Sequence, residues 1–262
     1  MKLNFENKTA LVSGSTKGIG FAIAKQLVEE GARVIINGRS EKNVTSALQE
    51  ISKAYPQARI EGFVGDLSTE KETQDLLKLF PEVDILVNNL GIFDPRPFEE
   101  VSDDEWRKFF EVNVLSGVRL SRAYIPAMKK KNWGRIIFIS SESGIQTPVE
   151  MIHYGMTKTA QLAVSRGLAE YCSGTGITVN AILPGPTRSE GVDEFVGKLS
   201  GGKSFEEFQK EFFKSVRPSS LIKRFATTEE VAALVTFVCS PKASAITGAA
   251  LRADGGVVRS CF

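Results

Sequence analysis

The stretch "TALVSGSTKGIG", residues 9–20, sets a short apolar run of β-forming residues directly before a loop with three glycines. The glycines are Gly14, Gly18 and Gly20, with the spacing G-x-x-x-G-x-G. At a strand–helix junction, such a loop makes a tight turn that brings backbone N–H groups and the helix N-terminus up to a pyrophosphate. Glycines also serve ordinary turns, but the place of this loop after the first strand favours a dinucleotide-binding fold.

The rest of the chain repeats this alternation of short apolar runs and amphipathic segments. The runs expected to form strands are 9–14, 33–37, 59–66, 84–89, 135–140, 177–183 and 249–254. The helices are expected at about 19–30, 41–54, 69–80, 103–130, 154–171 and 228–239. Strands that are hydrophobic nearly throughout are typical of a parallel sheet covered on both faces. We therefore predict an α/β protein with one domain over 1–262, built on a doubly wound parallel seven-stranded sheet, the Rossmann fold.

The composition is that of an ordinary globular protein and argues against several classes. Of the 262 residues, 42% are hydrophobic and 24% are charged. A net charge of +2 does not indicate a surface that binds nucleic acid. The basic run 129–131 is expected at a helix end, where cations complement the helix dipole. The three cysteines lack C-x-x-C spacing, which argues against disulfides and a metal site. With no signal-peptide core and no apolar run near the ~20 residues of a membrane span, we expect a soluble cytoplasmic protein.

Only residues 187–225 depart from the alternation. This excursion places charges among five phenylalanines, which are Phe195, Phe205, Phe208, Phe212 and Phe213. We interpret Gly201-Gly202 as a hinge or turn between two short helices, and a long excursion of this kind is often a lid over a substrate. The helical spacing of the phenylalanines suits the core or a subunit contact, or alternatively a pocket wall for a bulky ketone.

The end of the second strand indicates which cofactor is bound. An NAD site usually has an Asp or Glu there, which accepts a hydrogen bond from the ribose 2′-OH. Here the segment is "INGRS", residues 36–40, with no carboxylate before Glu41. Arg39 and the glycine-loop residue Lys17 are instead suited to pair with the 2′-phosphate of NADP(H). The alternatives are that NAD is used and that Arg39 is a solvated loop residue.

Several further motifs follow the glycine loop in a fixed order. They are "GDLS" (65–68), "NNLG" (88–91), "VNV" (112–114), "ISSESG" (139–144), "YGMTK" (154–158), "PGPT" (184–187) and "DGG" (254–256). Together they resemble the short-chain dehydrogenase/reductase family of compact, single-domain type, over essentially the whole chain. The chain departs from the family pattern at Ser13, where threonine is more usual, and at Leu90, where alanine is usual.

The resemblance implies an oxidoreductase and assigns roles to residues. The catalytic residues would be Asn113, Ser141, Tyr154 and Lys158. The residues that would contact the cofactor are Gly14, Ser15, Lys17, Gly18, Ile19, Gly20, Arg39, Asp66, Leu67, Asn89, Gly91, Tyr154, Lys158, Pro184, Gly185 and Thr187. Asp66 would contact the adenine ring, and the loop 184–187 the nicotinamide carboxamide. The resemblance also implies a homo-oligomer, a tetramer or a dimer, paired through the helices at 103–130 and 154–171.

The chemistry of hydride transfer to a ketone suits these residue types. The reaction develops negative charge on the carbonyl oxygen, so the site must donate a proton and hold an oxyanion. A tyrosine hydroxyl has an ordinary pKa of about 10, and a nearby ammonium would lower it. Tyr154 and Lys158 are spaced i,i+4, on one face of a helix. By resemblance, Ser141, rather than Ser140, would donate a second hydrogen bond, and Asn113 would anchor a water that links Lys158 to solvent.

His153, the only histidine, directly precedes this tyrosine. It could line the mouth of the substrate pocket, but neighbours on a helix point about 100° apart, so it does not share the face of Tyr154. One histidine provides no metal cluster, and no G-x-S-x-G motif supports a hydrolase. We interpret it as a structural or solvent-facing residue.

The charges near the expected substrate pocket conflict. Glu142 and Glu150 are unfavourable for an anionic substrate, whereas Arg188 and Arg217 could receive one. We predict an NADP(H)-dependent carbonyl reductase or secondary-alcohol dehydrogenase whose partner is a small carbonyl or alcohol substrate. The alternatives are an NAD-dependent dehydrogenase of a sugar, cyclitol or steroid alcohol, and a non-catalytic cofactor-binding protein on the same fold.

Overall fold

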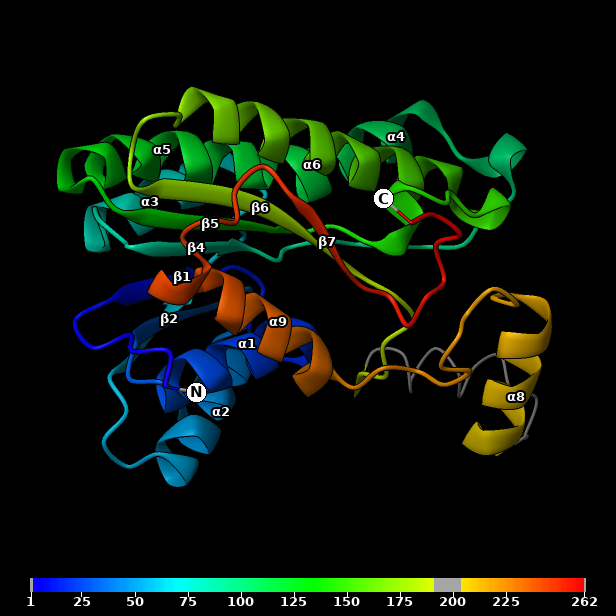
Figure 1. Ribbon diagram of the computed structural model, residues 1–262, viewed down its shortest axis with the longest axis horizontal. Coiled ribbons are helices and arrows are strands. Elements are labelled where there is room, and N and C mark those ends of the chain that lie inside the picture. The colour runs from blue at the N-terminus through cyan, green and yellow to red at the C-terminus, as the bar shows by residue number, and fades with distance from the viewer. Residues whose placement is uncertain (1, 191–203, 262) are drawn as a thin grey trace.

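The apolar runs of the sequence form the strands of one parallel sheet (Figure 1). The computed structural model describes residues 2–190 and 204–261. The strands are β1 (Thr9–Val12), β2 (Arg33–Gly38), β3 (Ile60–Val64), β4 (Ile85–Asn88), β5 (Gly134–Ile139), β6 (Ile177–Pro184) and β7 (Ala250–Ala253). Their order in the sheet is β3-β2-β1-β4-β5-β6-β7, and every neighbouring pair is parallel. The predicted doubly wound Rossmann fold is confirmed.

The helices alternate with the strands as expected. They are α1 (Gly18–Glu29), α2 (Glu41–Ala54), α3 (Glu70–Leu79), α4 (Asp103–Phe110), α5 (Ser116–Lys131), α6 (Ile152–Tyr171), α8 (Phe205–Ser215) and α9 (Thr228–Cys239). Helices α1, α2 and α9 cover one face of the sheet, and α3 to α6 cover the other (Figure 1). The predicted bounds differ by one or two residues because hydrogen bonds at element ends depend on their surroundings.

Both faces of the sheet are buried because successive strand residues point to opposite sides. In β1, Val12 packs with the cluster under α1 and α9, whereas Leu11 packs with the cluster that includes Leu120 and Tyr124 of α5. Strand β6 is buried along its whole length. This two-sided burial explains why the strands are apolar runs rather than alternating patterns.

One long helix predicted at 103–130 is interrupted in the structure. Helices α4 and α5 are joined by a π-helical turn over Glu111–Leu115. The turn contains Asn113, whose backbone oxygen accepts a hydrogen bond of 2.6 Å from Gln161 Nε2 of α6. Single π-helical turns are frequent at functional sites. Helical periodicity alone does not show such a turn, because one extra residue in a turn hardly changes the apolar pattern of the sequence.

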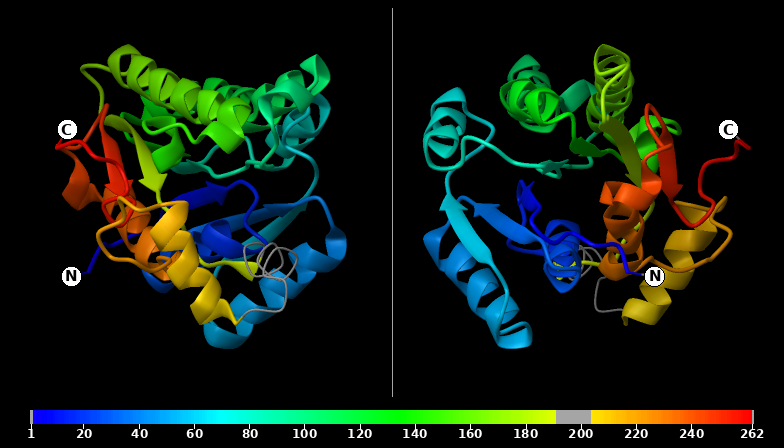
Figure 2. Two further views of the ribbon diagram at one scale, coloured as in Figure 1. Left: turned by 90° about the vertical axis from the view of Figure 1, so that its right-hand side faces the viewer. Right: turned by 60° about the vertical axis from the view of Figure 1, so that its left-hand side comes forward.

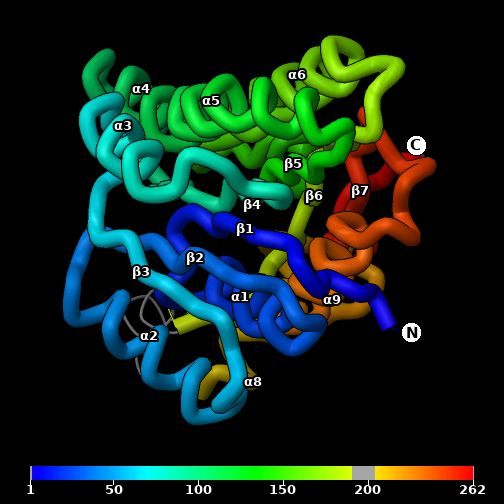
Figure 3. Tube along the Cα trace, turned by 90° about the vertical axis from the view of Figure 1, so that its left-hand side faces the viewer, coloured from blue at the N-terminus to red at the C-terminus, as the bar shows by residue number. Residues whose placement is uncertain are grey.

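The strand order places a crevice at one edge of the sheet. Strand β1 lies between β2 and β4, so the chain winds away from β1 in both directions (Figure 3). Ligands of open α/β sheets bind at this switch point, outside the carboxyl ends of the strands. The glycine loop follows β1 at this edge, and helix α8 projects at the same end of the molecule (Figures 1 and 2).

The structure describes the excursion at 187–225 over residues 187–190 and 204–225, so Phe195 lies outside the described residues. Helix α8 begins with a capping box in which Ser204 and Glu207 exchange hydrogen bonds, and it ends before Val216. The predicted hinge at Gly201-Gly202 lies outside the described residues. No helix in 2–190 or 204–261 is long and apolar enough to cross a membrane.

Candidate active site

The glycine loop is built so that its backbone faces outward at the crevice. Gly14 and Gly18 have φ values of +60° and +59°, in the left-handed region that glycine adopts without strain. Asn89 Nδ2 donates to the carbonyl oxygens of Ser13 and Gly14, at 3.0 and 2.9 Å. A Cβ on Gly20 would lie 2.4 Å from that nitrogen, so only glycine lets the helix start against the asparagine. Asn89 therefore joins the loop after β1 to the loop after β4.

The side chains of two residues predicted to contact the cofactor, Ser15 and Leu67, are engaged by the protein itself. The hydroxyl of Ser15 donates to Val12 O at 2.6 Å and accepts from Asn37 N at 2.9 Å, so it holds β1 and β2 together. The side chain of Leu67 is buried in the core, which leaves only its backbone for a ligand. The carboxylate of Asp66 accepts from Ser68 N at 3.0 Å and stays partly exposed.

The two cations predicted to select NADP(H) are both solvent-exposed at the crevice edge. Arg39 directly follows the last residue of β2, and Lys17 is the N-cap residue of α1. Both side chains are thus available to a phosphate.

Helix α6 places Tyr154 and Lys158 at the carboxyl end of β5. Lys158 Nζ donates to Ile139 O, the last residue of β5, at 2.9 Å, and lies 5.5 Å from the centre of the Tyr154 ring. A Cβ on Gly91 would lie 3.4 Å from Lys158 Nζ, so the glycine of "NNLG" leaves the ammonium accessible. Burial lowers the pKa of Lys158 to about 7.

The pKa of Tyr154 moves in the opposite direction to the one predicted. Burial raises it above its ordinary value, and the carboxylate of Glu142 raises it further, while a hydrogen bond with Ser141 and the charge of Arg217 lower it. Sequence reasoning expected the ammonium of Lys158 to lower this pKa. In the structure desolvation by the surrounding protein is the largest cause, and it disfavours the charged phenolate.

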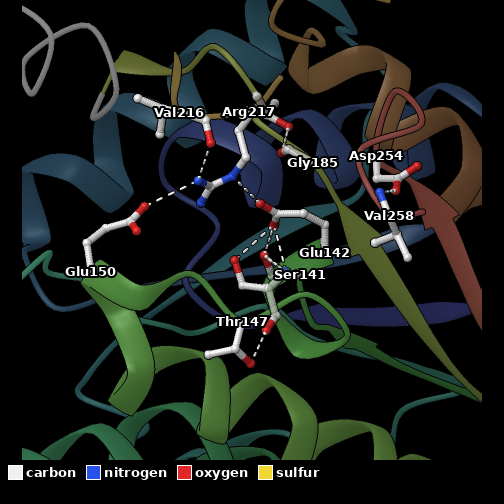
Figure 4. Close-up of polar contacts among 11 residues, drawn as sticks. Ser141, Glu142, Thr147, Glu150, Gly185, Val216, Arg217, Asp254 and Val258 are labelled. Carbon is white, nitrogen blue, oxygen red and sulfur yellow. Dashed lines mark hydrogen bonds and ion pairs between the residues drawn. The ribbon is translucent and has the colours of Figure 1, made fainter. Parts of the chain in front are cut away.

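The two adjacent serines, Ser140 and Ser141, differ in their hydrogen-bond partners. Ser140 Oγ donates to the carbonyl oxygen of Lys158 at 2.8 Å, which ties β5 to α6. Ser141 donates its hydroxyl to the carboxylate of Glu142, and its oxygen accepts from Ser143 N at 3.1 Å (Figure 4). Ser141 faces the cavity beside Tyr154 as predicted, and its contact with Glu142 was not foreseen.

Asn113 supports the site without lining it. Its side-chain oxygen accepts from Ile92 N at 2.8 Å, and its Nδ2 donates to Ile92 O at 3.0 Å and to Thr157 Oγ1 at 2.9 Å. The asparagine thereby fixes the chain directly after Gly91. Its backbone oxygen accepts from Gln161 Nε2 of α6.

A cavity of about 550 Å³ brings half of the predicted site residues together. The predicted residues that line it are Ile19, Asn89, Gly91, Ser141, Tyr154, Lys158, Pro184, Gly185 and Thr187. The predicted residues that lie outside its lining are Gly14, Ser15, Lys17, Gly18, Gly20, Arg39, Asp66, Leu67 and Asn113. This division separates a nucleotide end, along the glycine loop and β2, from a reaction end at Tyr154.

The "PGPT" loop borders the cavity and is supported by the "DGG" motif. Gly185 N donates to Ala253 O at 3.1 Å, and a Cβ on Gly185 would lie 2.5 Å from Asp254 O. The carboxylate of Asp254 accepts from Gly256 N at 3.0 Å and Val258 N at 2.9 Å, which holds the turn after β7. The C-terminal motif is therefore a structural brace for the loop.

The wall of the cavity opposite Tyr154 includes aromatic residues. Phe208 and Phe212 of α8 and Phe225 line it, and the Phe212 and Phe225 rings lie 5.0 Å apart between centres. On the near side, Phe93 packs edge-on against Tyr154 at 6.4 Å between ring centres. Sequence reasoning anticipated α8 as a wall but missed Phe93, for which the only signal was its position just after "NNLG".

His153 serves packing rather than chemistry. It is buried, and its ring meets Phe109 edge-on at 4.3 Å and Trp106 at 6.0 Å between ring centres. It does not line the cavity, and burial lowers its pKa. In the described ranges 2–190 and 204–261, no group of three His, Cys, Asp or Glu side chains is placed to hold a metal ion.

Comparison with known proteins gives consistent matches over the whole chain. Residues 14–258 match the family model described as "Enoyl-(Acyl carrier protein) reductase". The chain is 52% identical to the "Uncharacterized oxidoreductase YvaG" of Bacillus subtilis (strain 168) over 264 residues, with all of both chains covered.

Among solved structures, L-sorbose reductase from Gluconobacter frateurii in complex with NADPH and L-sorbose is 28% identical, with a TM-score of 0.93 and coverage of 99% of this chain and 100% of that one. A protein described as "short chain dehydrogenase/reductase family protein" is 31% identical, with a TM-score of 0.84 and 98% of both chains covered.

Proposed function

Because the chain belongs to the short-chain dehydrogenase/reductase family of oxidoreductases, we propose that it is an NADP(H)-dependent carbonyl reductase, which in the reverse direction oxidises a secondary alcohol. The observation that carries the proposal is the convergence of Ser141, Tyr154 and Lys158 on one cavity beside Asn89 and Gly91. These groups come from three different segments of the chain, after β4, after β5 and on α6, and meet at the carboxyl edge of the sheet, where a dinucleotide binds in this fold.

The residues present fit a nicotinamide dinucleotide, which would supply or accept the hydride. Gly14, Gly18 and Gly20 keep the loop after β1 free of side chains, and Asn89 holds it in place. Gly91 leaves room above Lys158 Nζ. The cofactor would run from the exposed end of β2, past the glycine loop, to the cavity.

The preference for NADP(H) rests on charge. Arg39 and Lys17 are exposed at the end where the adenosine ribose would lie, and the end of β2 lacks a carboxylate. Arginine binds a phosphate bidentately, whereas an NAD site uses a carboxylate at this position. The similar L-sorbose reductase was solved with NADPH.

Tyr154 would donate the proton to the carbonyl oxygen. Its raised pKa keeps the hydroxyl protonated at neutral pH, so the proton is in place for reduction. Ser141 would hold the same oxygen once its hydroxyl turns from Glu142 toward the substrate. Lys158 would lie near the nicotinamide ribose and, when charged, would stabilise the phenolate left after proton transfer.

The variant Tyr154→Phe tests this assignment because it removes only the hydroxyl. With a carbonyl-compound library and NADPH oxidation as the assay, we expect a loss of kcat/KM of about 10²- to 10⁴-fold. NADPH affinity, measured by fluorescence titration, should stay unchanged. The matched control is Tyr171→Phe, at the exposed end of the same helix. Full turnover by Tyr154→Phe contradicts the role, and an empty screen with intact NADPH binding favours the non-catalytic alternative.

We also propose that the protein is a homo-oligomer, as the resemblance implied. Helices α4, α5 and α6 lie together on one face of the sheet and would form the contact (Figure 1). Light scattering coupled to size-exclusion chromatography measures the mass of the particle. A mass of one 28.6 kDa chain at micromolar concentration contradicts this proposal.

A further inference from the structure

The reaction end of the cavity carries an unusual set of charges. Among the described residues that line it, the carboxylates are those of Glu142, Glu150 and Glu211, and the cations are Lys158 and Arg217. The sequence left open whether the arginines of the excursion would receive an anionic substrate. The contacts of Arg217 decide this question.

Arg217 already binds two carboxylates, in an arrangement that we call the Glu142–Arg217–Glu150 cluster (Figure 4). Its Nε donates to Glu142 Oε1 at 3.1 Å, and its Nη1 donates to Glu150 Oε1 at 3.2 Å and to Val216 O at 3.0 Å. The side chains of Arg217 and Glu142 are only 10% and 6% exposed. An incoming carboxylate would have to displace one of these partners.

The buried partner, Glu142, is itself held on its second oxygen. That oxygen accepts from the Ser141 hydroxyl, from Ser143 N at 2.8 Å and from Ser143 Oγ at 3.1 Å. Removing Arg217 from Glu142 would leave a buried carboxylate without its counter-charge, which is strongly unfavourable. The positive charge of Arg217 is therefore balanced by groups of the protein and is not available to an anionic substrate.

The other two cations near the site, Arg188 and Lys158, do not offer a full positive charge to an anionic substrate in place of Arg217. Arg188 is not among the residues that line the cavity, and its guanidinium lies 3.9 Å from the centre of the Phe205 ring. Lys158 Nζ is bound to Ile139 O, and burial lowers its pKa to about 7, so it carries only part of a charge at neutral pH. The aromatic side chains of α8 complete a pocket that repels anions and favours apolar groups.

We propose that this pocket selects uncharged carbonyl compounds and rejects carboxylates, and that the Glu142–Arg217–Glu150 cluster sets this specificity. The inference deepens the proposed function and rests on it. The substrate class is a neutral ketone, keto ester or keto alcohol whose side chain packs against the phenylalanines. A hydroxyl group on the substrate can donate to Glu150, which is the more exposed of the two glutamates.

The test compares matched pairs of neutral and anionic substrates with the full chain and NADPH. Each pair is a keto acid and its methyl ester, such as acetoacetate and methyl acetoacetate or benzoylformate and methyl benzoylformate, alongside simple ketones. We expect kcat/KM for the esters to exceed that for the acids at least about tenfold, since like charges placed together in an interface are strongly disfavoured.

Charge-removing variants then assign the effect to the cluster. Glu142→Gln and Glu150→Gln each remove one negative charge beside Arg217 and leave part of its positive charge unbalanced, so the ester-to-acid ratio should fall by about tenfold in each variant, one decade corresponding to 1.4 kcal/mol. Replacing Glu142 can also disturb the fold of the site, because its carboxylate accepts a hydrogen bond from Ser141. Glu150→Gln is therefore included as a second variant, since Glu150 is not bonded to Ser141. The matched control, Glu170→Gln at the exposed far end of α6, should leave the ratio unchanged.

The outcomes are distinguishable. If the acids are reduced as well as the esters, the specificity inference is overturned while the proposed function stands. If the esters are preferred but Glu142→Gln and Glu150→Gln leave the ratio unchanged, the assignment to the cluster is overturned. If NADPH binds but no ketone, ester or acid is reduced, the proposed function fails and this inference fails with it.

Discussion

Lys158 is a buried ammonium. Its replacement by methionine tests by how much burying this charge lowers the free energy of unfolding. The side chain is 4% exposed, and its Nζ has the carbonyl oxygen of Ile139 as a hydrogen-bond acceptor. No carboxylate contributes to its altered pKa, which burial alone lowers from 10.5 to about 7. Methionine has a similar length and no charge, so Lys158→Met removes the desolvated group with little change in volume.

The magnitude follows from the difference between the two pKa values. About 3.5 pH units separate the folded and unfolded states, and at 1.36 kcal/mol each this is a cost of about 5 kcal/mol for the charged form in the folded protein. Methionine leaves the Ile139 carbonyl without its partner, at a cost of about 1–3 kcal/mol. We therefore expect Lys158→Met to raise the free energy of unfolding by about 2–4 kcal/mol at pH 6.

The sign of the pH dependence is fixed by the same values. Between pH 7 and 10.5 the unfolded chain binds more protons at this lysine than the folded chain, so the stability of the wild type rises with pH across this window. The advantage of the variant is nearly complete below pH 7 and is lost before pH 10.5, because the missing hydrogen bond to the Ile139 carbonyl then outweighs it. At pH 9.5 the charged form costs the wild type only about 1–1.5 kcal/mol, so the variant should be between about as stable as the wild type and about 2 kcal/mol less stable.

Urea unfolding of the cofactor-free proteins at pH 6, 7.5 and 9.5 measures these free energies, at one fixed protein concentration because an oligomer would couple stability to concentration. The control is Lys53→Met, an exposed lysine in the last turn of α2, which should change stability little at any pH. Turnover of Lys158→Met should be lost. A variant that is less stable than the wild type at pH 6, or a difference that does not change with pH, refutes the reasoning.

Three further substitutions have expected outcomes. Arg39→Ala should weaken NADPH binding by roughly 10- to 100-fold and leave NADH binding unchanged, as measured by fluorescence titration; equal effects on both cofactors would remove the argument for a phosphate contact. His153→Ala should lower the free energy of unfolding by about 2–4 kcal/mol through the cavity it leaves beside Phe109, with kcat retained; a loss of kcat in folded protein would give the histidine a catalytic role. Gly20→Ala places a Cβ 2.4 Å from Asn89 Nδ2 and should weaken NADPH binding at least about tenfold while circular dichroism stays native; undiminished binding would show that the loop tolerates the displacement.

Much of the fold could be predicted because its signals are local. Each buried strand is a short apolar run, each helix has its own periodicity, and Gly14 and Gly18 occupy the left-handed conformations that the loop after β1 requires. The spacing of Tyr154 and Lys158 needs only one helix to place both side chains on one face. The family resemblance then ordered these local features along the chain.

The tertiary structure decided what depends on partners distant in the sequence. The sequence around Ser140 does not indicate its partner, because only the packing of α6 against β5 brings the Lys158 carbonyl oxygen to its hydroxyl. The backbone oxygen of Asn113, in the π-helical turn, accepts from Gln161 Nε2 on another helix, 48 positions along the chain. The pKa of Tyr154 is raised chiefly by desolvation, and the neighbouring Lys158 is not among its causes.

The same division holds for the substrate end of the site. The sequence by itself determined a parallel α/β sheet, a nucleotide loop and a tyrosine–lysine pair, since backbone propensity and side-chain periodicity act over a few residues. Whether Arg217 would receive an anion was settled only by the fold, which brings it to Glu142 across 75 positions of the chain. Charges are neutralised by whichever group lies nearest in space, and that distance is set by tertiary packing.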